Sequence, residues 1–277
     1  MSNIITILKE LFDNIQLTWA IARYNNRSSF QGHKFGVVWE FLNPLIQIAL
    51  WGFVFGVLRG RGTVNVNGNS IPFLPWMLVG MTIWLFMNRA VIGGASSVKK
   101  RIKLVSKMQL PSSIIPAISI ASKLTSYLIL LLFVFVVLFV FGFAPTIYWL
   151  GFFYYFIAML IFIYFFSLLN STIAMVFPDY LNLLKPIMRL FFFFSGAIWR
   201  LQEMVQQNSL PAWFVRLMDL TPFSYIINGL RNAFLGNVFF HEDWIMTSAA
   251  FWLIVLLISI IGTHLHLKLR AKFIDLA

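Results

Sequence analysis

The densest group of charged side chains lies in one short stretch, SSVKKRIKLVSKMQLPSSIIP, at residues 96–116. It holds Lys99, Lys100, Arg101, Lys103 and Lys107. Cations this close together could bind nucleic acid, phosphate or an anionic membrane surface. The chain on both sides is almost uncharged and rich in Phe, Leu, Ile and Val. We therefore interpret the cluster as a loop between apolar segments and expect no nucleic-acid partner.

Other residue patterns that could do chemistry are sparse. The sequence has no GxxxxGK[ST] phosphate loop, no GxSxG and no HExxH motif, and it contains no cysteine. Thiolate metal sites, disulfides and cysteine nucleophiles are thereby excluded. The run His241, Glu242, Asp243 is interpreted as a solvated turn rather than a metal site. We expect no catalytic residue, no metal and no cofactor in this chain.

Composition indicates a helical membrane protein. Of the 277 residues, 60% are hydrophobic and 11% are charged, whereas a soluble domain carries about 25% charged residues. A helix needs roughly 20 apolar residues to cross the hydrocarbon core. Six segments meet this expectation approximately, so we predict an all-α fold with six spans at about 36–58, 73–95, 113–141, 147–177, 183–199 and 246–267.

The distribution of Lys and Arg predicts the orientation of these spans. The net charge is +12, and cations gather in the N-terminal segment, around 96–123, around 178–189 and in the C-terminal tail. Short cytoplasmic loops carry such an excess. We expect one multi-pass domain in the plasma membrane, with both termini cytoplasmic: an interfacial helix at 1–35, the six spans at 36–267 and a tail at 268–277.

The first twenty residues have the pattern of an amphipathic helix. One helical face collects Ile4, Leu8, Leu11, Phe12, Ile15 and Trp19. Such a helix lies in the membrane interface or packs against the protein's own core, and the two can hold together. The cations that follow are candidates for attracting an anionic lipid headgroup, or they only anchor the topology: Arg23, Arg27, His33 and Lys34.

Two further features are a broken apolar segment before the last span and two charged residues within the spans. The segment 200–245 is broken by Pro and Gly yet strongly apolar, which predicts short re-entrant helices on the outer side before the last span. Within the spans, Glu40 and Arg89 are expected at similar depth. They could form a buried ion pair, Arg89 could meet an anionic substrate, or either could extend to the interface.

Several motifs carry a resemblance to a known family. GVVWEFLNPLIQI opens the first span, QLPSSIIP closes the basic segment, and PFSYIINGLR precedes the last span. The most specific positions are Gly36, Trp39 and Pro44, together with Pro222, Phe223, Ile227 and Arg231. The chain resembles the permease subunit of ABC-2 type exporters, in the branch that moves polysaccharides and polyol phosphates. Within it, the similarity is greatest to the permeases that export teichoic acid in Gram-positive bacteria.

The resemblance implies partners that the chain itself lacks. Two permease copies would form a homodimer with two copies of a separate ATP-binding subunit, which would hold ATP and Mg. The substrate would be a lipid-linked (polyprenyl pyrophosphate) polymer moved outward. The rigid, proline-closed basic segment would dock on the ATPase through residues Lys100, Arg101, Ile102, Lys103, Leu104, Val105 and Met108.

A polymer path needs walls that stack weakly on sugars, which aromatic rings provide. The path candidates are Trp39, Trp51, Arg89, Tyr154, Tyr155, Tyr164, Phe191 and Trp199. The alternative is that these rings face lipid or pack between helices. Pro222, Phe223 and Arg231 are candidates for an outer gate, or they only cap the dimer.

Two alternative functions remain open, and a third is disfavoured. One is an export permease for O-antigen, capsule or another lipid-linked polysaccharide. Another is a drug or small-lipid exporter of the same superfamily, with a different cavity. A membrane enzyme acting on lipid-linked sugars is disfavoured, because it would need clustered acidic or His residues near a membrane face.

Overall fold

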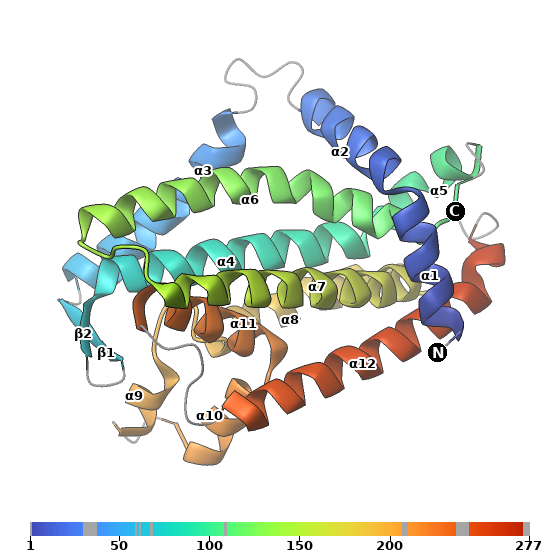
Figure 1. Cartoon of the computed structure of the whole chain (residues 1–277). Coiled ribbons are helices and arrows are strands. Elements are labelled where there is room, and N and C mark those ends of the chain that lie inside the picture. The colour runs from blue at the N-terminus through green and yellow to red at the C-terminus, as the bar shows by residue number, and fades with distance from the viewer. Residues whose placement is uncertain are drawn as a thin grey trace.

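The computed structural model describes residues 2–29, 38–58, 60, 62–66, 69–107, 110–206, 210–236 and 244–273. Four helices in this part are long and apolar enough to cross a membrane. They are α4 (Phe73–Ala95), α6 (Ile114–Val140), α7 (Gly151–Val176) and α12 (Trp244–Leu269). They run side by side as the body of the molecule (Figure 1).

Helix α4 is the centre of this bundle. Within its most apolar window 78% of the residues are buried, against 33% in α6 and in α12. Glycines let its neighbours approach closely: a Cβ placed on Gly94 would lie 2.4 Å from the hydroxyl oxygen of Ser167 in α7. Apolar residues all around α4 therefore pack against protein, whereas the outer sides of α6 and α12 remain exposed.

The two remaining predicted spans are not among these four helices. Helix α3 (Val38–Gly52) continues as a π-helical turn at Phe53–Leu58. Helix α8 (Tyr180–Phe194) has 15 residues, or roughly 22 Å at 1.5 Å per residue. It ends at Ser195 and Gly196, whose φ of 72° is accessible to glycine, and not at residue 199. The count of six spans stays a prediction.

Helices α6 and α7, at the third and fourth predicted spans, are joined by a tight turn. Helix α6 ends at Val140, and Gly142 with φ 83° reverses the chain. A 3-10 turn, Ile147–Leu150, then leads into α7. Both helices pack against α4 more extensively than against each other.

The N-terminal segment forms two helices, α1 (Ser2–Asp13) and α2 (Ile15–Ser29). Part of the predicted apolar face, Ile4, Leu8 and Leu11, packs against the core together with the fully buried Ile7. Phe12, Ile15 and Trp19 remain exposed. Packing against the protein is thus observed for one part of the face, and contact with a membrane stays a prediction for the other.

A short β-hairpin departs from the all-α expectation. Strands β1 (Thr63–Val66) and β2 (Asn69–Pro72) are antiparallel, with Val64 opposite Ile71. These two side chains are buried. The sequence carries Asn67-Gly68 between them, a dipeptide typical of tight hairpins. The hairpin leads directly into α4 and lies at the far end of the bundle from the termini (Figure 1).

Three short helices precede α12: α9 (Leu201–Gln206), α10 (Ala212–Asp219) and α11 (Pro222–Arg231), the last followed by a π-helical turn at Asn232–Gly236. Thr221 caps α11 by accepting a hydrogen bond from the Ser224 amide. Nearly all of α11 is buried, and it packs against α4, α7 and α12. Its re-entrant position in a membrane stays a prediction.

The opposite end of the bundle carries α5 (Ser97–Lys107), α1 and both chain termini (Figure 1). Glu10 connects several of these segments. Its carboxylate pairs with Arg270 at 2.8 Å and accepts a hydrogen bond from Ser113 at the start of α6. His266 lies buried between Ser112 and Thr172, each 2.9 Å from one ring nitrogen. The ends of α1, α6, α7 and α12 are therefore linked by polar contacts.

Candidate functional site

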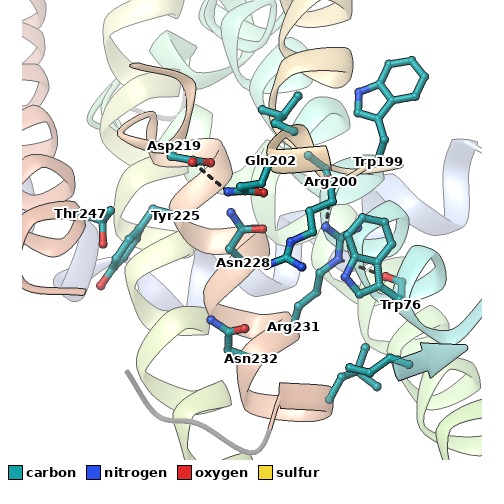
Figure 2. Close-up of a pocket in the computed structure, with 14 residues that line it drawn as sticks. Trp76, Trp199, Arg200, Gln202, Asp219, Tyr225, Asn228, Arg231, Asn232 and Thr247 are labelled. Carbon is teal, nitrogen blue, oxygen red and sulfur yellow. Dashed lines mark hydrogen bonds between the residues drawn. The ribbon is translucent and has the colours of Figure 1, made fainter. Parts of the chain in front are cut away.

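A polar cavity of about 160 Å³ lies beside α11, at the hairpin end of the bundle (Figure 2). Side chains from α4, from the turn after α8 and from α9 to α12 surround it. The polar and aromatic lining residues are Trp76, Trp199, Arg200, Gln202, Asp219, Tyr225, Asn228, Arg231, Asn232 and Thr247. Two guanidinium groups and one carboxylate make this lining cationic.

Arg231 is the most buried cation of this cavity, with 4% of its surface exposed. Its Nε donates to the Trp76 carbonyl at 3.1 Å, and its two Nη atoms donate to the carbonyls of Gly196 and Ala197. The Cζ atom lies 3.5 Å from the centre of the Trp76 ring, a cation–π distance. Through these hydrogen bonds Arg231, which lies on α11, connects the turn after α8 to α4 and α11.

Gly80 in α4 provides the space for this guanidinium. A Cβ at Gly80 would lie 1.8 Å from one Nη atom of Arg231 and 2.7 Å from the Ala197 carbonyl oxygen. Atoms cannot approach so closely, so only glycine fits while Arg231 keeps its place. Arg200 makes a second connection, because its Nη1 donates to the Asn65 carbonyl of the β-hairpin.

A groove of about 270 Å³ lies between α3, α4 and α8. Aromatic rings form much of its wall: Trp51, Trp84, Phe192 and Phe193. Three polar side chains also face it, Gln47, Asn88 and Arg189. Polar groups on apolar helices of this length are costly in a membrane unless they meet water, protein or a substrate. The groove therefore combines stacking surfaces with hydrogen-bonding groups.

Trp199 joins the groove to the polar cavity beside α11, which is named the outer cavity because the sequence predicts that residues 200–245 lie on the outer side. Its ring stacks on Phe193 of the groove, with centroids 5.6 Å apart, and its Nε1 donates to the Phe193 carbonyl at 2.6 Å. The same indole lines the outer cavity. Trp51 lies further along the groove and meets Phe192 with a centroid distance of 5.8 Å. The predicted path residues Trp51 and Trp199 thus belong to one continuous row of aromatic rings.

The other predicted path residues lie elsewhere. Tyr155 and Tyr164 are buried between helices, and the Tyr155 ring fills the space that a side chain at Gly229 would need. Tyr154 is exposed, and its hydroxyl oxygen lies 3.0 Å from the hydroxyl oxygen of Tyr225. Arg89 lines a separate cavity of about 20 Å³ with Lys123. Trp39 is exposed on α3.

Phe223 and Phe191 are neighbours, with ring centroids 5.0 Å apart. Phe223 also contacts Trp84 of α4 and Phe162 of α7 at 5.5 and 5.2 Å. This buried ring, with Pro222 at the first turn of α11, fixes α11 inside the bundle. The three predicted gate residues are thereby placed on one helix. Whether they move as a gate stays a prediction.

The segment predicted to couple to the ATPase forms the short helix α5 as far as Lys107. Val98 and Ile102 point inward and pack with Ile115, Met175 and Phe273. Ile102 therefore anchors α5 to the bundle rather than presenting a contact surface. Lys99 and Lys100 are exposed.

Arg101 of α5 is half-buried, and its Nη1 has no partner among the described residues. Burial lowers the pKa of Arg101 from its ordinary value. The guanidinium nevertheless stays charged because that ordinary value is above 12. Arg101 is thus a partly buried cation that lies next to the two exposed lysines of this helix.

Most of the headgroup candidates and part of the coupling segment lie outside the described residues. Arg23 is exposed on α2. His33, Lys34 and Met108 lie outside the described residues, as does the run 241–243. The side chains of Arg27, Glu40, Lys103, Leu104 and Val105 also lie outside the described part. The pairing of Glu40 with Arg89 therefore stays a prediction.

Sequence reasoning missed the groove residues Gln47, Asn88, Trp84 and Arg189. A signal was present, since Gln47 and Asn88 are isolated carboxamides within apolar runs. It also missed the carboxamides that surround Arg231 in the outer cavity. Their grouping depends on the turn after α8 folding back onto α11, which no local pattern indicates.

Comparison with known sequences gives the family. Residues 16–235 match the profile of the family described as ABC-2 type transporter. The chain belongs to the ABC-2 type transporter family. Its apolar helices agree with a multi-pass membrane protein of this family.

Curated relatives within this family are distant but cover most of the chain. An O-antigen export system permease protein RfbA of Myxococcus xanthus is 22% identical over 205 residues, 74% of this chain and 76% of the relative. A protein of the same name from Klebsiella pneumoniae is 20% identical over 267 residues, 96% of this chain and 95% of the relative. The match thus extends from α1 to α12. These names agree with the alternative of O-antigen export better than with teichoic acid.

Proposed function

We propose that this ABC-2 protein is the permease subunit of an ATP-driven exporter for a lipid-linked polysaccharide or polyol-phosphate polymer. The observation that carries the proposal is the aromatic groove between α3, α4 and α8, with its polar side chains Gln47, Asn88 and Arg189. Flat rings stack on sugar faces with little loss of conformational entropy. Carboxamides and a guanidinium supply exchangeable hydrogen bonds, so a hydrophilic chain can slide without being held at one point.

The narrower substrate is part of the proposal. The names of the relatives favour an O-antigen type of polysaccharide. The sequence resemblance favours teichoic acid and a Gram-positive host. Both polymers are hydrophilic and carried on a polyprenyl pyrophosphate, and both suit an aromatic groove. The two polymers differ in whether phosphate is a regular part of the repeat unit.

Energy would come from a separate ATP-binding subunit holding ATP and Mg. Support lies in α5, where Lys99 and Lys100 are exposed and Arg101 has a buried Nη1 without a partner among the described residues. Carboxylates of the ATP-binding subunit would pair with the two exposed lysines. Because Val98 and Ile102 anchor α5 to α6, α7 and the C-terminal segment, a push on α5 would be transmitted to the bundle.

The export complex would contain two permeases, each contributing one groove to a shared path. Both termini would be cytoplasmic in the plasma membrane, in agreement with α5 and the two termini lying at one end of the bundle (Figure 1). The cationic end of the chain would then face the cytoplasm.

Substitution of the groove carboxamides tests the proposal. We expect Asn88→Leu combined with Gln47→Leu to lower polymer export at least tenfold in cells, because the wall loses two of its three polar side chains while its shape is kept. The measurement is polymer at the cell surface, with protein level followed in membranes. Gln16→Leu is the control, since Gln16 is exposed on α2 and lies outside the groove.

Unchanged export by the double variant, at normal protein level, would remove the groove from the path. If Gln16→Leu lowered export as much as the double variant, the loss of export would reflect a general disturbance of the protein and not a change in the groove.

A further inference from the structure

The outer cavity contains hydrogen-bonding groups that the protein itself does not use. Three N–H groups of Arg231 donate to backbone carbonyls, and a guanidinium has five, so two remain. The side-chain amides of Asn228 and Asn232 have no hydrogen-bond partner among the described residues. These groups come from one helix and the turn after it, and all line the cavity.

The charge of the cavity is not balanced within it. Arg200 and Arg231 contribute two positive charges, and Asp219 contributes one negative charge. The Asp219 carboxylate accepts a hydrogen bond from Gln202 at 3.0 Å. In Figure 2 Asp219 and Gln202 lie together above Asn228, and Arg231 lies below it beside Trp76. The buried end of the cavity is therefore the cationic end.

A buried cation needs an anion or a full set of acceptors. Backbone carbonyls solvate Arg231 on one side, and the cavity lies on another. Guanidinium groups bind phosphate through paired hydrogen bonds, and two of them line this cavity together with the carboxamides of Asn228 and Asn232. A phosphate, with its several oxygens, matches this number of donors better than a carboxylate with two.

We propose that the outer cavity is a binding site for a phosphate group, held by Arg200 and Arg231 with Asn228 as a further donor. The phosphate could belong to the emerging polymer or to the headgroup of an anionic phospholipid. The polymer source rests on the proposed export function, whereas binding of a phosphate probe does not. The two proposals can thus fail separately.

Phosphorus NMR on the purified full chain tests the site. In maltoside micelles, which contain no phosphorus, the 31P line of added glycerol 3-phosphate reports binding through its broadening. We expect wild-type protein to broaden the line in a saturable way. Arg200→Gln and Asn228→Leu should each weaken the apparent affinity at least fivefold, because each removes a donor.

Arg216→Gln is the matched control. Arg216 lies on α10 of the same outer segment, is exposed and does not line the cavity. It should leave the apparent affinity within twofold of wild type. Glycerate, which carries a carboxylate in place of the phosphate ester arm, has no phosphorus, so its binding is measured by competition: it should displace glycerol 3-phosphate with an affinity at least tenfold weaker.

Native mass spectrometry distinguishes the two sources. Retention of an anionic phospholipid by wild type, lost on Arg200→Gln, would assign the phosphate to a lipid headgroup. Glycerol 3-phosphate binding without such retention would assign it to the polymer. Either outcome supports the site. The proposal is overturned if neither ligand binds, if Arg216→Gln is as damaging as Arg200→Gln, or if glycerate binds as well as glycerol 3-phosphate.

Discussion

Replacing Gly80 by alanine is expected to destabilise the protein by about 3 kcal/mol, lowering its melting temperature in micelles by roughly 5–10 °C. The new methyl group would occupy the place of an Arg231 Nη atom, which lies 1.8 Å from the Cβ position. Arg231 would have to leave its carbonyl acceptors, so a buried charge would lose its partners. The turn after α8 would then separate from α4 and α11.

Gly52→Ala is the control for this substitution. Its Cβ would meet Met77 and Leu74 side chains at 3.4 and 3.5 Å, which are ordinary contacts, and the residue is also helical. We expect little change in its melting temperature. An unchanged melting temperature for Gly80→Ala would show that the stability of the bundle does not depend on the hydrogen bonds between Arg231 and its backbone carbonyl acceptors.

Reversing the charge of Lys99 and Lys100 together is expected to reduce polymer export at least tenfold. Both side chains are exposed on α5, so their replacement by Glu leaves the packing of Val98 and Ile102 intact. Contact with the ATP-binding subunit would be lost, and ATP hydrolysis would no longer drive transport. Export and ATP hydrolysis are measured on the same membranes.

The matched control reverses Lys9 and Lys268, two exposed lysines on α1 and α12. Both double variants change the net charge equally, so a difference between them is local to α5. Because the chain has no cysteine, a single reporter cysteine can establish that the topology is unchanged. Normal coupling in the α5 variant would remove this helix from the mechanism.

The body of the fold follows from sequence patterns that act locally. Long apolar runs predict α4, α6, α7 and α12 because a span must satisfy its backbone hydrogen bonds internally. Pro111 and Pro116 similarly predict where α5 gives way to α6. The break at Asn14 between α1 and α2 has no equally strong signal. Within α1 itself, Ile7 enters the core whereas Phe12 is exposed.

The candidate sites depend on contacts that sequence distance conceals. Arg231 meets Trp76 across more than 150 residues of chain, and no periodicity predicts that pairing. Aromatic content predicted a stacking surface, yet only the tertiary arrangement separates Trp51 and Trp199, in one row, from the packed rings of Tyr155 and Tyr164. The β-hairpin was missed because the composition and apolar runs predicted an all-helical chain.

The central claim is that this chain is the permease on which a separate ATPase depends. The most direct measurement is ATP hydrolysis by an ATP-binding subunit co-expressed and purified with this chain in micelles, compared with the same subunit alone. We predict a stable complex whose hydrolysis rate differs from that of the isolated subunit and responds to reversal of Lys99 and Lys100. The absence of a complex, or a rate independent of this chain, would contradict the account.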